Sequence, residues 1–395
     1  MNAYTIKNEV SSEKILVADD MILTKDLPTA AGSKMLDGYV SLFDSEALTR
    51  LSDAGYTLCG KADVGEFAID LLGETSYNGA CVADGVIKNP AAEILSAGEA
   101  TVALVMDVNG SPRRAAAQSG LVSVKPTYGV VSRFGTIPVA CSGECVSLMA
   151  RSAADCREAL SAVSGYDEKD GTSLPEGMRV AETAPVRRVA LLKSMTAGID
   201  ADVQAKLDAA VSALTAAGIE VVEVDDTVIA ASRVAWNTLM SAELCNNVSR
   251  YDGVKYGYRA LYFTNLDELY VNSRTEAFGD LLKTAILFGS ETLSTENYMK
   301  VYDKALRTRR VIAEAFAKLF ESFDAVLTPA CSALAYTQDA VKADKYMAYT
   351  ENFYTAPASI TGLPAVVAGG VQLVGRAFSE LALLDLAKTC EKEGN

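Results

Sequence analysis

The sequence contains no histidine, and this absence limits its chemistry more than any other feature of its composition. Without histidine, no Ser–His or Cys–His catalytic pair can form, and no imidazole can bind a metal. Cysteine occurs eight times but never as CxxC, so we expect reduced, buried thiols and no metal site. A serine nucleophile in this chain must therefore use a lysine, a carboxylate or a chain of hydroxyl groups as its base.

Long hydrophobic runs are also missing. The longest, ATVALVM at 100–106, has the length of a strand, so no transmembrane helix is predicted. The first residues, MNAYTIKNEVSSEK, lack the apolar segment of a signal peptide. We therefore expect a cytoplasmic protein that does not bind membranes.

Positive charge is scarce. The chain has 36 basic and 51 acidic side chains and a formal net charge of −15. Such a surface repels phosphate backbones, so direct nucleic-acid binding over a broad face is not expected. The basic stretch RTRR at 307–310 has helical spacing and is interpreted as a solvated helix face.

Short apolar strands alternate with amphipathic helices, which predicts an α/β fold with a mixed or mostly parallel sheet. The predicted strands are 14–19, 55–60, 101–106, 187–193, 218–224, 324–329 and 364–374, and the last of these is broken by Gly369-Gly370. The region 229–322 is predicted to be mainly helical, with a helix starting at the capping residues near 294. We expect one domain over 1–395, made of a strand-rich core (1–163), a polar loop (164–187), a helix-rich part (188–323) and a return to the core (324–395).

The stretch DVNGSPRR at 107–114 presents a candidate nucleophile. Ser111 follows a glycine directly after a predicted strand, as nucleophilic serines often do. A turn serine can also simply accept hydrogen bonds from nearby backbone N–H groups, and we favour that reading for Ser111. For Asp107 and Arg113 we favour an ion pair that holds the turn.

Several blocks resemble the amidase signature family, and most of all the A subunits (GatA type) of tRNA-dependent amidotransferases. They are SVKPTYGVVSRFGTIP (123–138), SRYDGVKYGYRA (249–260), SRTEAFGD (273–280), GKADVGEFAIDLLGETS (60–76) and the ITGLPAVV…GGVQLVG block (360–375). The resemblance implies a large twisted mixed β-sheet flanked by helices. It also implies amide hydrolysis by a Ser–cis-Ser–Lys triad without a cofactor. In A subunits, this reaction releases ammonia from glutamine for a B subunit that carries the tRNA contacts.

The resemblance places the family's nucleophile motif, close to DTGGSIR, on residues 107–113. Ser111 falls at the nucleophile, and Asp107, Gly110 and Arg113 match as well. Asn109 replaces the first glycine of the turn whose backbone N–H groups form the oxyanion hole. Since Asn adopts a positive φ less freely than Gly, we expect the oxyanion hole to be partly kept.

The other two members of the triad are missing. The family's lysine motif, close to VKDNI, aligns with VADDMI at 17–22, which puts Ala18 at the lysine position. Lys25, Lys34 and Lys61 match positions other than that of the base.

The Gly/Ser-rich loop that carries the cis-serine has no counterpart. Ungapped counting places Ile87 there, and alignment on Asn89-Pro90 deletes the loop. Ser96 lies near an apparent helix start and is interpreted as structural.

The family's substrate-binding charges are also replaced. An arginine is expected where this chain has Thr284 or Ala285, and an aspartate where it has Asn352. We therefore predict a catalytically inactive paralog that acts as a subunit, a scaffold or a ligand-binding protein. The alternative is an active amidase that hydrolyses a small amide through Ser111 with a substitute base. The partners implied are a B-like subunit or a homologous A-like chain, and the implied ligand is a small amide.

Overall fold

The computed structural model describes residues 3–180 and 184–391, and an eleven-stranded mixed sheet forms its centre. In spatial order the strands are β1 (Tyr4–Lys7), β3 (Thr57–Ala62), β2 (Ile15–Asp19), β6 (Val102–Asp107), β8 (Cys145–Ala150), β7 (Val122–Lys125), β13 (Ala365–Ala368), β14 (Val371–Gly375), β11 (Ala325–Pro329), β9 (Arg188–Leu192) and β10 (Glu220–Val224). Strands β3, β2 and β6 are parallel, as are β11, β9 and β10, and the other pairings are antiparallel.

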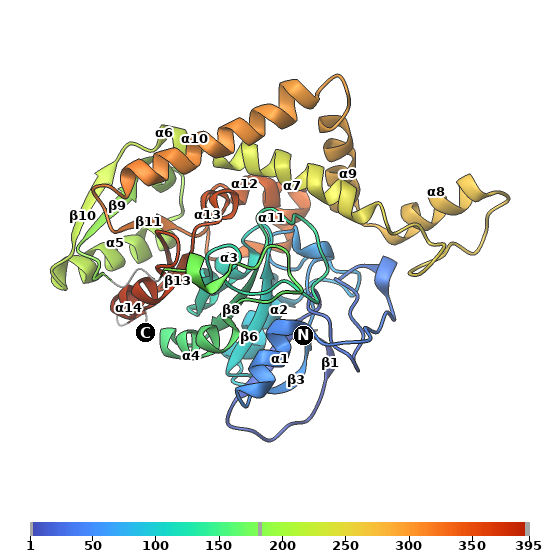
Figure 1. Cartoon of the computed structure of the whole chain (residues 1–395), viewed down its shortest axis with the longest axis horizontal. Coiled ribbons are helices and arrows are strands. Elements are labelled where there is room, and N and C mark those ends of the chain that lie inside the picture. Colours follow the sequence, from blue (N-terminus) through green and yellow to red (C-terminus); the bar gives the residue numbers. More distant parts are fainter. Residues whose placement is uncertain (1–2, 181–183, 392–395) are drawn as a thin grey trace.

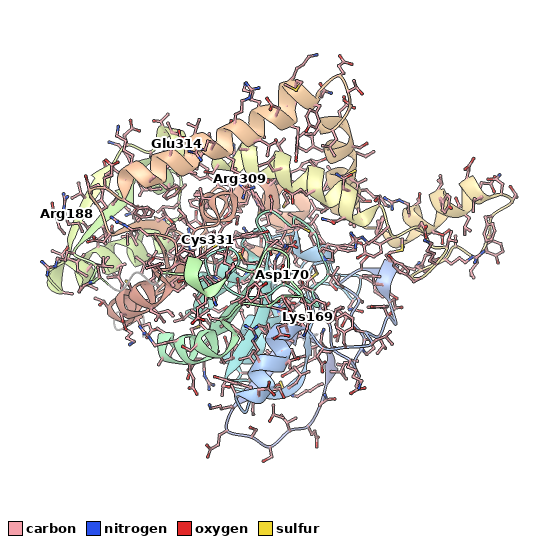
Figure 2. The ribbon with its side chains drawn as sticks, viewed as in Figure 1. Lys169, Asp170, Arg188, Arg309, Glu314 and Cys331 are labelled. Atoms are coloured by element: carbon pink, nitrogen blue, oxygen red, sulfur yellow. The ribbon has the colours of Figure 1, made fainter. Side chains whose placement is uncertain are left out.

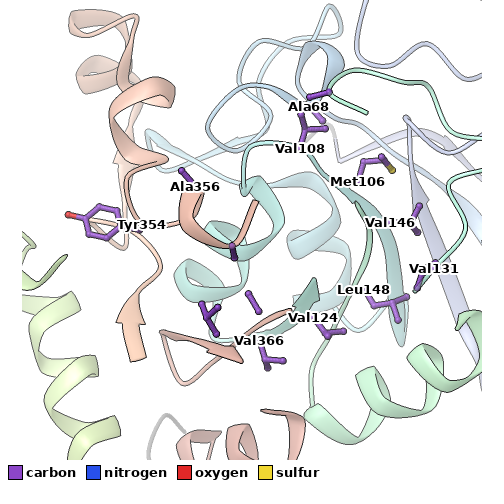
Figure 3. Close-up of a cluster of buried hydrophobic side chains, with 14 of the residues drawn as sticks. Ala68, Met106, Val108, Val124, Val131, Val146, Leu148, Tyr354, Ala356 and Val366 are labelled. Carbon is purple, nitrogen blue, oxygen red and sulfur yellow. The ribbon is translucent and has the colours of Figure 1, made fainter. Parts of the chain in front are cut away.

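The middle strands are buried on both faces. Every residue of β6, β7, β8, β11, β13 and β14 is buried, which explains why their sequences are nearly continuous aliphatic runs. Figure 3 shows side chains of neighbouring strands, including Met106, Val124 and Val366, gathered in this core. The predicted α/β class with a large mixed sheet is confirmed.

Helices cover the sheet. Those of the sheet region are α1 (Glu46–Asp53), α2 (Pro90–Ser96), α3 (Ser111–Ser119), α4 (Ala153–Val163), α5 (Ala201–Ala216) and α14 (Glu380–Glu391). A second group contains α6 (Thr227–Ala230), α7 (Ser232–Val248), α8 (Leu266–Ala277), α9 (Asp280–Thr292), α10 (Asp303–Leu319), α11 (Gln338–Ala343), α12 (Met347–Glu351) and α13 (Ala356–Thr361). Within this group α7 packs against α9, α10 and α13, whereas α8 extends away from the body of the molecule (Figure 1).

A small second sheet lies beside the main one. It pairs β12 (Tyr336–Thr337), β5 (Val86–Ile87) and β4 (Val82–Ala83), and so joins the 82–87 segment to a segment about 250 residues further along the chain. The main sheet likewise continues across the polar loop at 164–187, because β9, β10 and β11 extend it.

One predicted helix start is wrong, and a second is followed by irregular turns before the regular helix. Ser96 is the exposed last residue of α2, which begins at Pro90 with Asn89 as its N-cap. The helix predicted from the 294 region begins at Asp303, after a π-helical turn over Tyr298–Tyr302. Ser294 does act as a cap, because its hydroxyl accepts the N–H of Asn297 at 3.3 Å at the start of the turns that lead into this helix. The predicted strand 364–374 is split into β13 and β14 by Gly369 and Gly370, whose φ values are 59° and 86°.

Candidate functional site

The candidate nucleophile lies in the tight turn between β6 and α3. Asp107 ends the strand, Gly110 is the N-cap of α3, and Ser111 is the first residue of the helix. Gly110 has a φ of 85°, and a Cβ atom there would lie 2.3 Å from the Cβ of Thr355. Asn109 does not have a positive φ, so Gly110 is the left-handed residue of this turn. The asparagine therefore does not need the backbone conformation that favours glycine.

The Ser111 hydroxyl has no side-chain hydrogen bond to any residue that the structure describes. The prediction that it accepts bonds from local backbone N–H groups is therefore wrong. The reason is its position: a capping serine precedes the helix and accepts from the N2 or N3 amide, whereas Ser111 is already inside the first turn and Gly110 is the cap. Ser111 is 5% exposed.

Ala18 lies in β2, completely buried, at the position that the resemblance gives to the lysine base. The sheet register sets it opposite Lys61 of β3 on one side and Leu104 of β6 on the other. A methyl group at this position can neither donate nor accept a proton. Of the other two lysines in the aligned segment, Lys34 lies over the ring of Tyr258 at 4.0 Å and Lys25 is exposed.

Lys61 is fully buried and its ammonium group is already occupied. It donates to the carbonyl of Ile22 and, at 3.1 Å, to the Thr29 hydroxyl, and it lies 3.9 Å from Oδ1 of Asp20. Burial lowers the pKa of Lys61 to about 8, although the Asp20 carboxylate opposes this shift. None of its hydrogen bonds reaches Ser111.

Two buried carboxyl groups next to Ala18 were not identified as a site from the sequence. Asp19 accepts the backbone N–H groups of Met21 (3.0 Å) and Met106 (2.7 Å), and burial raises its pKa to about 6. Asp20 accepts the N–H of Ala30 at 3.0 Å, and burial raises its pKa to about 7. Its Oδ1 atom has no hydrogen bond within the described chain. The adjacent acidic residues at the end of a buried strand were the available signal.

Asp107 and Arg113 form the predicted ion pair, and both are completely buried. Nε and Nη2 of Arg113 donate to the two carboxylate oxygens at 2.7 and 2.9 Å. Burial tends to raise the pKa of Asp107, but the charge and hydrogen bonds of Arg113 hold it below its usual value. The guanidinium group also donates to the carbonyl of Thr355, to Ser359 and to Gln372. This group therefore fastens the turn to the segment 355–372.

Asn352, where the resemblance predicts a substrate-binding aspartate, contacts the turn that carries Ser111. Its Nδ2 donates to Oδ1 of Asn109 at 2.8 Å and also to Oδ1 of Asn237 in α7. Asn109 in turn donates to the carbonyl of Ile69 at 3.0 Å. The structure thus joins two predicted positions that are 243 residues apart, and adds Asn237, which the sequence did not indicate.

Two of the remaining candidate positions line a cavity that is separate from the turn at Ser111. Ile87 and Thr284 both line a cavity of about 690 Å³ beside α9 and α11, which Ser111, Ala18 and Asn352 do not line. Ala285, the other candidate for the substrate arginine, is buried in α9.

Other reactive groups do not form a second centre. Burial raises the pKa of each of the eight cysteine thiols, so none is a ready thiolate nucleophile. Residues 3–180 and 184–391 contain no group of three or more side chains suited to hold a metal ion. The basic stretch at 307–310 lies on α10, where Arg309 binds Ser142 and Arg310 pairs with Glu314 at 2.7 Å (Figure 2).

Comparison with known proteins gives consistent matches. The family model named Amidase matches residues 19–384. The A subunit of a glutamyl-tRNA(Gln) amidotransferase of Acinetobacter baumannii is 36% identical over 94% of this chain and 80% of its own length. The A subunit from Lachnoclostridium phytofermentans is 34% identical over 94% of this chain and 82% of its own.

Solved structures share the architecture. The crystal structure of the glutamyl-tRNA(Gln) amidotransferase A subunit from Thermotoga maritima has a TM-score of 0.81 and 26% identity, and the match covers 99% of this chain and 87% of that one. The urea amidolyase of K. lactis also reaches a TM-score of 0.81, at 23% identity over 96% of this chain and 23% of that one, and so shares the fold alone.

Proposed function

The chain belongs to the amidase family, and we propose that it is a non-hydrolytic relative of amidotransferase A subunits that acts as one component of a complex. One observation carries the proposal: no described side chain that could act as a base is hydrogen-bonded to Ser111. The methyl group of Ala18 stands where the resemblance places the lysine.

The absence of a base beside Ser111 among the described residues matters because a serine hydroxyl group is a weak nucleophile on its own. A hydroxyl group attacks an amide at neutral pH only when an adjacent base takes its proton. Losing one member of a catalytic unit costs about as much as losing several, on the order of 10⁴ to 10⁶ in rate. Lys61, the buried lysine paired in register with Ala18, is committed to Ile22, Thr29 and Asp20.

The amides around the turn support the same proposal. Asn109 and Asn352 are both completely buried and hydrogen-bonded to each other. An aspartate at 352 would offer a charge to a substrate, whereas the Asn352 side chain is neutral and uses its donor within the protein. A small amide would have to break these hydrogen bonds to bind the Nδ2 group of Asn352, whereas the Oδ1 atom has no hydrogen-bond partner among the described residues.

An exposed apolar surface on the projecting segment supports a role within a complex. It is called the arm surface below and contains Val254, Tyr256, Leu261, Tyr262, Phe263, Leu266 and Val271. Leu261 and Tyr262 are 81% and 84% exposed, and Figure 1 shows α8 and the loop before it extending from the body. Contiguous exposed apolar side chains mark protein interfaces. Because the relatives are subunits by name, a B-like amidotransferase subunit is the proposed partner.

A cytoplasmic location is part of the proposal. The eight free cysteines support it, because thiols of secreted proteins usually form disulfides. Within the described residues, none of the helices has both the length and the apolar character needed to cross a lipid bilayer.

The first test is ammonia release from glutamine and asparagine by the purified chain, alone and with a B-like subunit. We expect the same background rate for the wild type and for Ser111→Ala. Release that is lost in Ser111→Ala would contradict the proposal and favour the alternative of an active amidase. In that case Lys61→Met identifies the substitute base, since Lys61 is the buried lysine paired in register with Ala18.

The second test addresses the role within a complex. The chain is co-expressed with a tagged B-like subunit, and we expect it to co-purify. Leu261→Asp with Tyr262→Asp should abolish co-purification. Val311→Asp on α10, where the valine is 50% exposed and outside the arm surface, is the matched control and should have no effect. Equal recovery of both variants would refute the assignment of the arm surface.

A further inference from the structure

The cavity of about 690 Å³ beside α9 and α11 has the size of a small-molecule site, for which about 300–1,000 Å³ is typical. Three separate parts of the chain enclose it: the segment 74–87, the first half of α9, and α11 with the residues after it. Neither Ser111 nor Asn352 contributes to it. The cavity is therefore distinct from the turn that carries the candidate nucleophile.

The walls of the cavity are mainly apolar. Ile87 contributes from β5, Leu281 and Leu287 from α9, and Val341 and Tyr346 from the α11 region. Ile87 is buried, whereas Leu287 is 71% exposed at the rim. An apolar ligand body would cover Leu287 and displace water from this surface.

The charges at the cavity are unbalanced toward the positive. Lys283, Lys342 and Lys345 line it, together with two acids, Glu74 and Asp280. Asp280 faces Lys283 at 3.8 Å. Lys342 and Lys345 have no ion pair with any described residue. Three basic side chains around one hollow stand out in a chain of net charge −15.

Two acidic residues near the cavity accept hydrogen bonds from backbone N–H groups. Both carboxylate oxygens of Glu74 accept backbone N–H groups, from Leu71 at 3.0 Å and from Leu72 at 2.9 Å. Asp344, between the two unpaired lysines, accepts the N–H of Tyr346 at 2.9 Å. These carboxylates keep their charge, but neither is paired with Lys342 or Lys345, whose exposed ammonium groups can attract an anion from solution.

We propose that this cavity binds an organic carboxylate with an aliphatic or aromatic body. The carboxylate would lie between Lys342 and Lys345, and the apolar body would rest on Leu281, Leu287 and Val341. This inference goes beyond the proposed function and does not depend on it, since it rests on the lysines and the apolar wall of the cavity and not on the hydroxyl group of Ser111. Failure of the ammonia test therefore leaves it standing, and its own failure leaves the role within a complex standing.

The test uses a fluorescent fatty acid, dansyl-aminoundecanoate, and its methyl ester as a neutral probe of the same body. We expect the acid to bind in a saturable way and octanoate to displace it. Lys342→Gln with Lys345→Gln should weaken binding of the acid about fivefold, because one exposed ion pair contributes up to about 1 kcal/mol. Leu287→Asp should weaken it further, because it adds a negative charge to the wall.

The matched control is Lys304→Gln with Lys318→Gln, which removes two exposed lysines of α10 outside the cavity. It lowers the net charge by the same amount and should leave the dissociation constant unchanged. Thermal unfolding of each variant verifies that it is folded. The proposal is overturned if the acid does not bind, if the ester binds equally well, or if the control variant weakens binding as much as the cavity variant.

Discussion

The substitution Asp107→Asn should strongly destabilise the protein, because it breaks a fully buried ion pair. Asp107 and Arg113 are both 0% exposed and joined by two hydrogen bonds of 2.7 and 2.9 Å. Asparagine keeps the shape but removes the charge, which leaves a buried guanidinium group without its counter-ion. Breaking a buried pair in this way costs about 3–5 kcal/mol.

The measurement is urea-induced unfolding at pH 7, followed by fluorescence. The chain has one tryptophan, Trp236, which is fully buried in α7 and so changes its environment on unfolding. The matched control is Glu220→Gln, which breaks the exposed pair between Arg188 and Glu220 (2.8 Å) at the sheet edge (Figure 2). That control should cost less than about 1 kcal/mol.

A double variant separates the loss of the ion pair from other effects of the two substitutions. Asp107→Asn combined with Arg113→Gln removes both charges, so its loss of stability should be smaller than the sum of the two single losses by about 1 kcal/mol or more. The reasoning is refuted if Asp107→Asn and Glu220→Gln lower the free energy of unfolding equally. Strict additivity in the double variant would show that the two charges are not coupled.

Three further outcomes are expected. Gly110→Ala should lower the free energy of unfolding in urea by well over the roughly 1–2 kcal/mol that a left-handed alanine costs, because its Cβ would lie 2.3 Å from the Cβ of Thr355. The control is Gly218→Ala, where φ is 81° and a Cβ would have nothing within 4 Å. It should cost only the backbone strain. Burial raises the pKa values of Asp19 and Asp20 to about 6 and 7 in the folded state. Between about pH 4 and 7 the folded state therefore binds more protons than the unfolded state, and the free energy of unfolding should fall as pH rises. Asp20→Asn should flatten this decline, and an equally steep curve would exclude Asp20 as its source. Ser111→Ala should leave stability within about 0.5 kcal/mol, since the hydroxyl makes no hydrogen bond that is lost, and a larger loss would reveal a partner for it.

The sequence predicts the sheet well because its central strands are buried on both faces. The runs at 101–106 and 324–329 have no polar face, which only an interior strand tolerates. The strand–turn–helix around Ser111 was also predictable, because Gly110 is the residue type that a left-handed turn position requires.

Contacts between distant segments could not be predicted. The hydrogen bond between Asn109 and Asn352 depends on how the 352 segment packs over the turn, and no local pattern encodes it. The commitment of Lys61 to Ile22 and Thr29 has the same origin, since a lysine in a strand can extend to either face of the sheet. The regular helix α10 begins only at Asp303, because a π-helical turn over Tyr298–Tyr302 follows the turn that Ser294 caps, and no local pattern indicates that turn.

The residues that match the family's nucleophile motif are also residues that stabilise the fold. Asp107, Arg113 and Gly110 match, and each is held in place by a buried ion pair or a left-handed backbone conformation that no other residue type replaces cheaply. At the lysine position, Ala18 is buried between Lys61 and Leu104, and the neighbouring carboxyl groups of Asp19 and Asp20 accept backbone N–H groups, so they have polar partners without a lysine at 18. The buried contacts of Asp107, Gly110 and Arg113 give the fold its own reason to keep this turn, so the motif around Ser111 is by itself no evidence of catalysis.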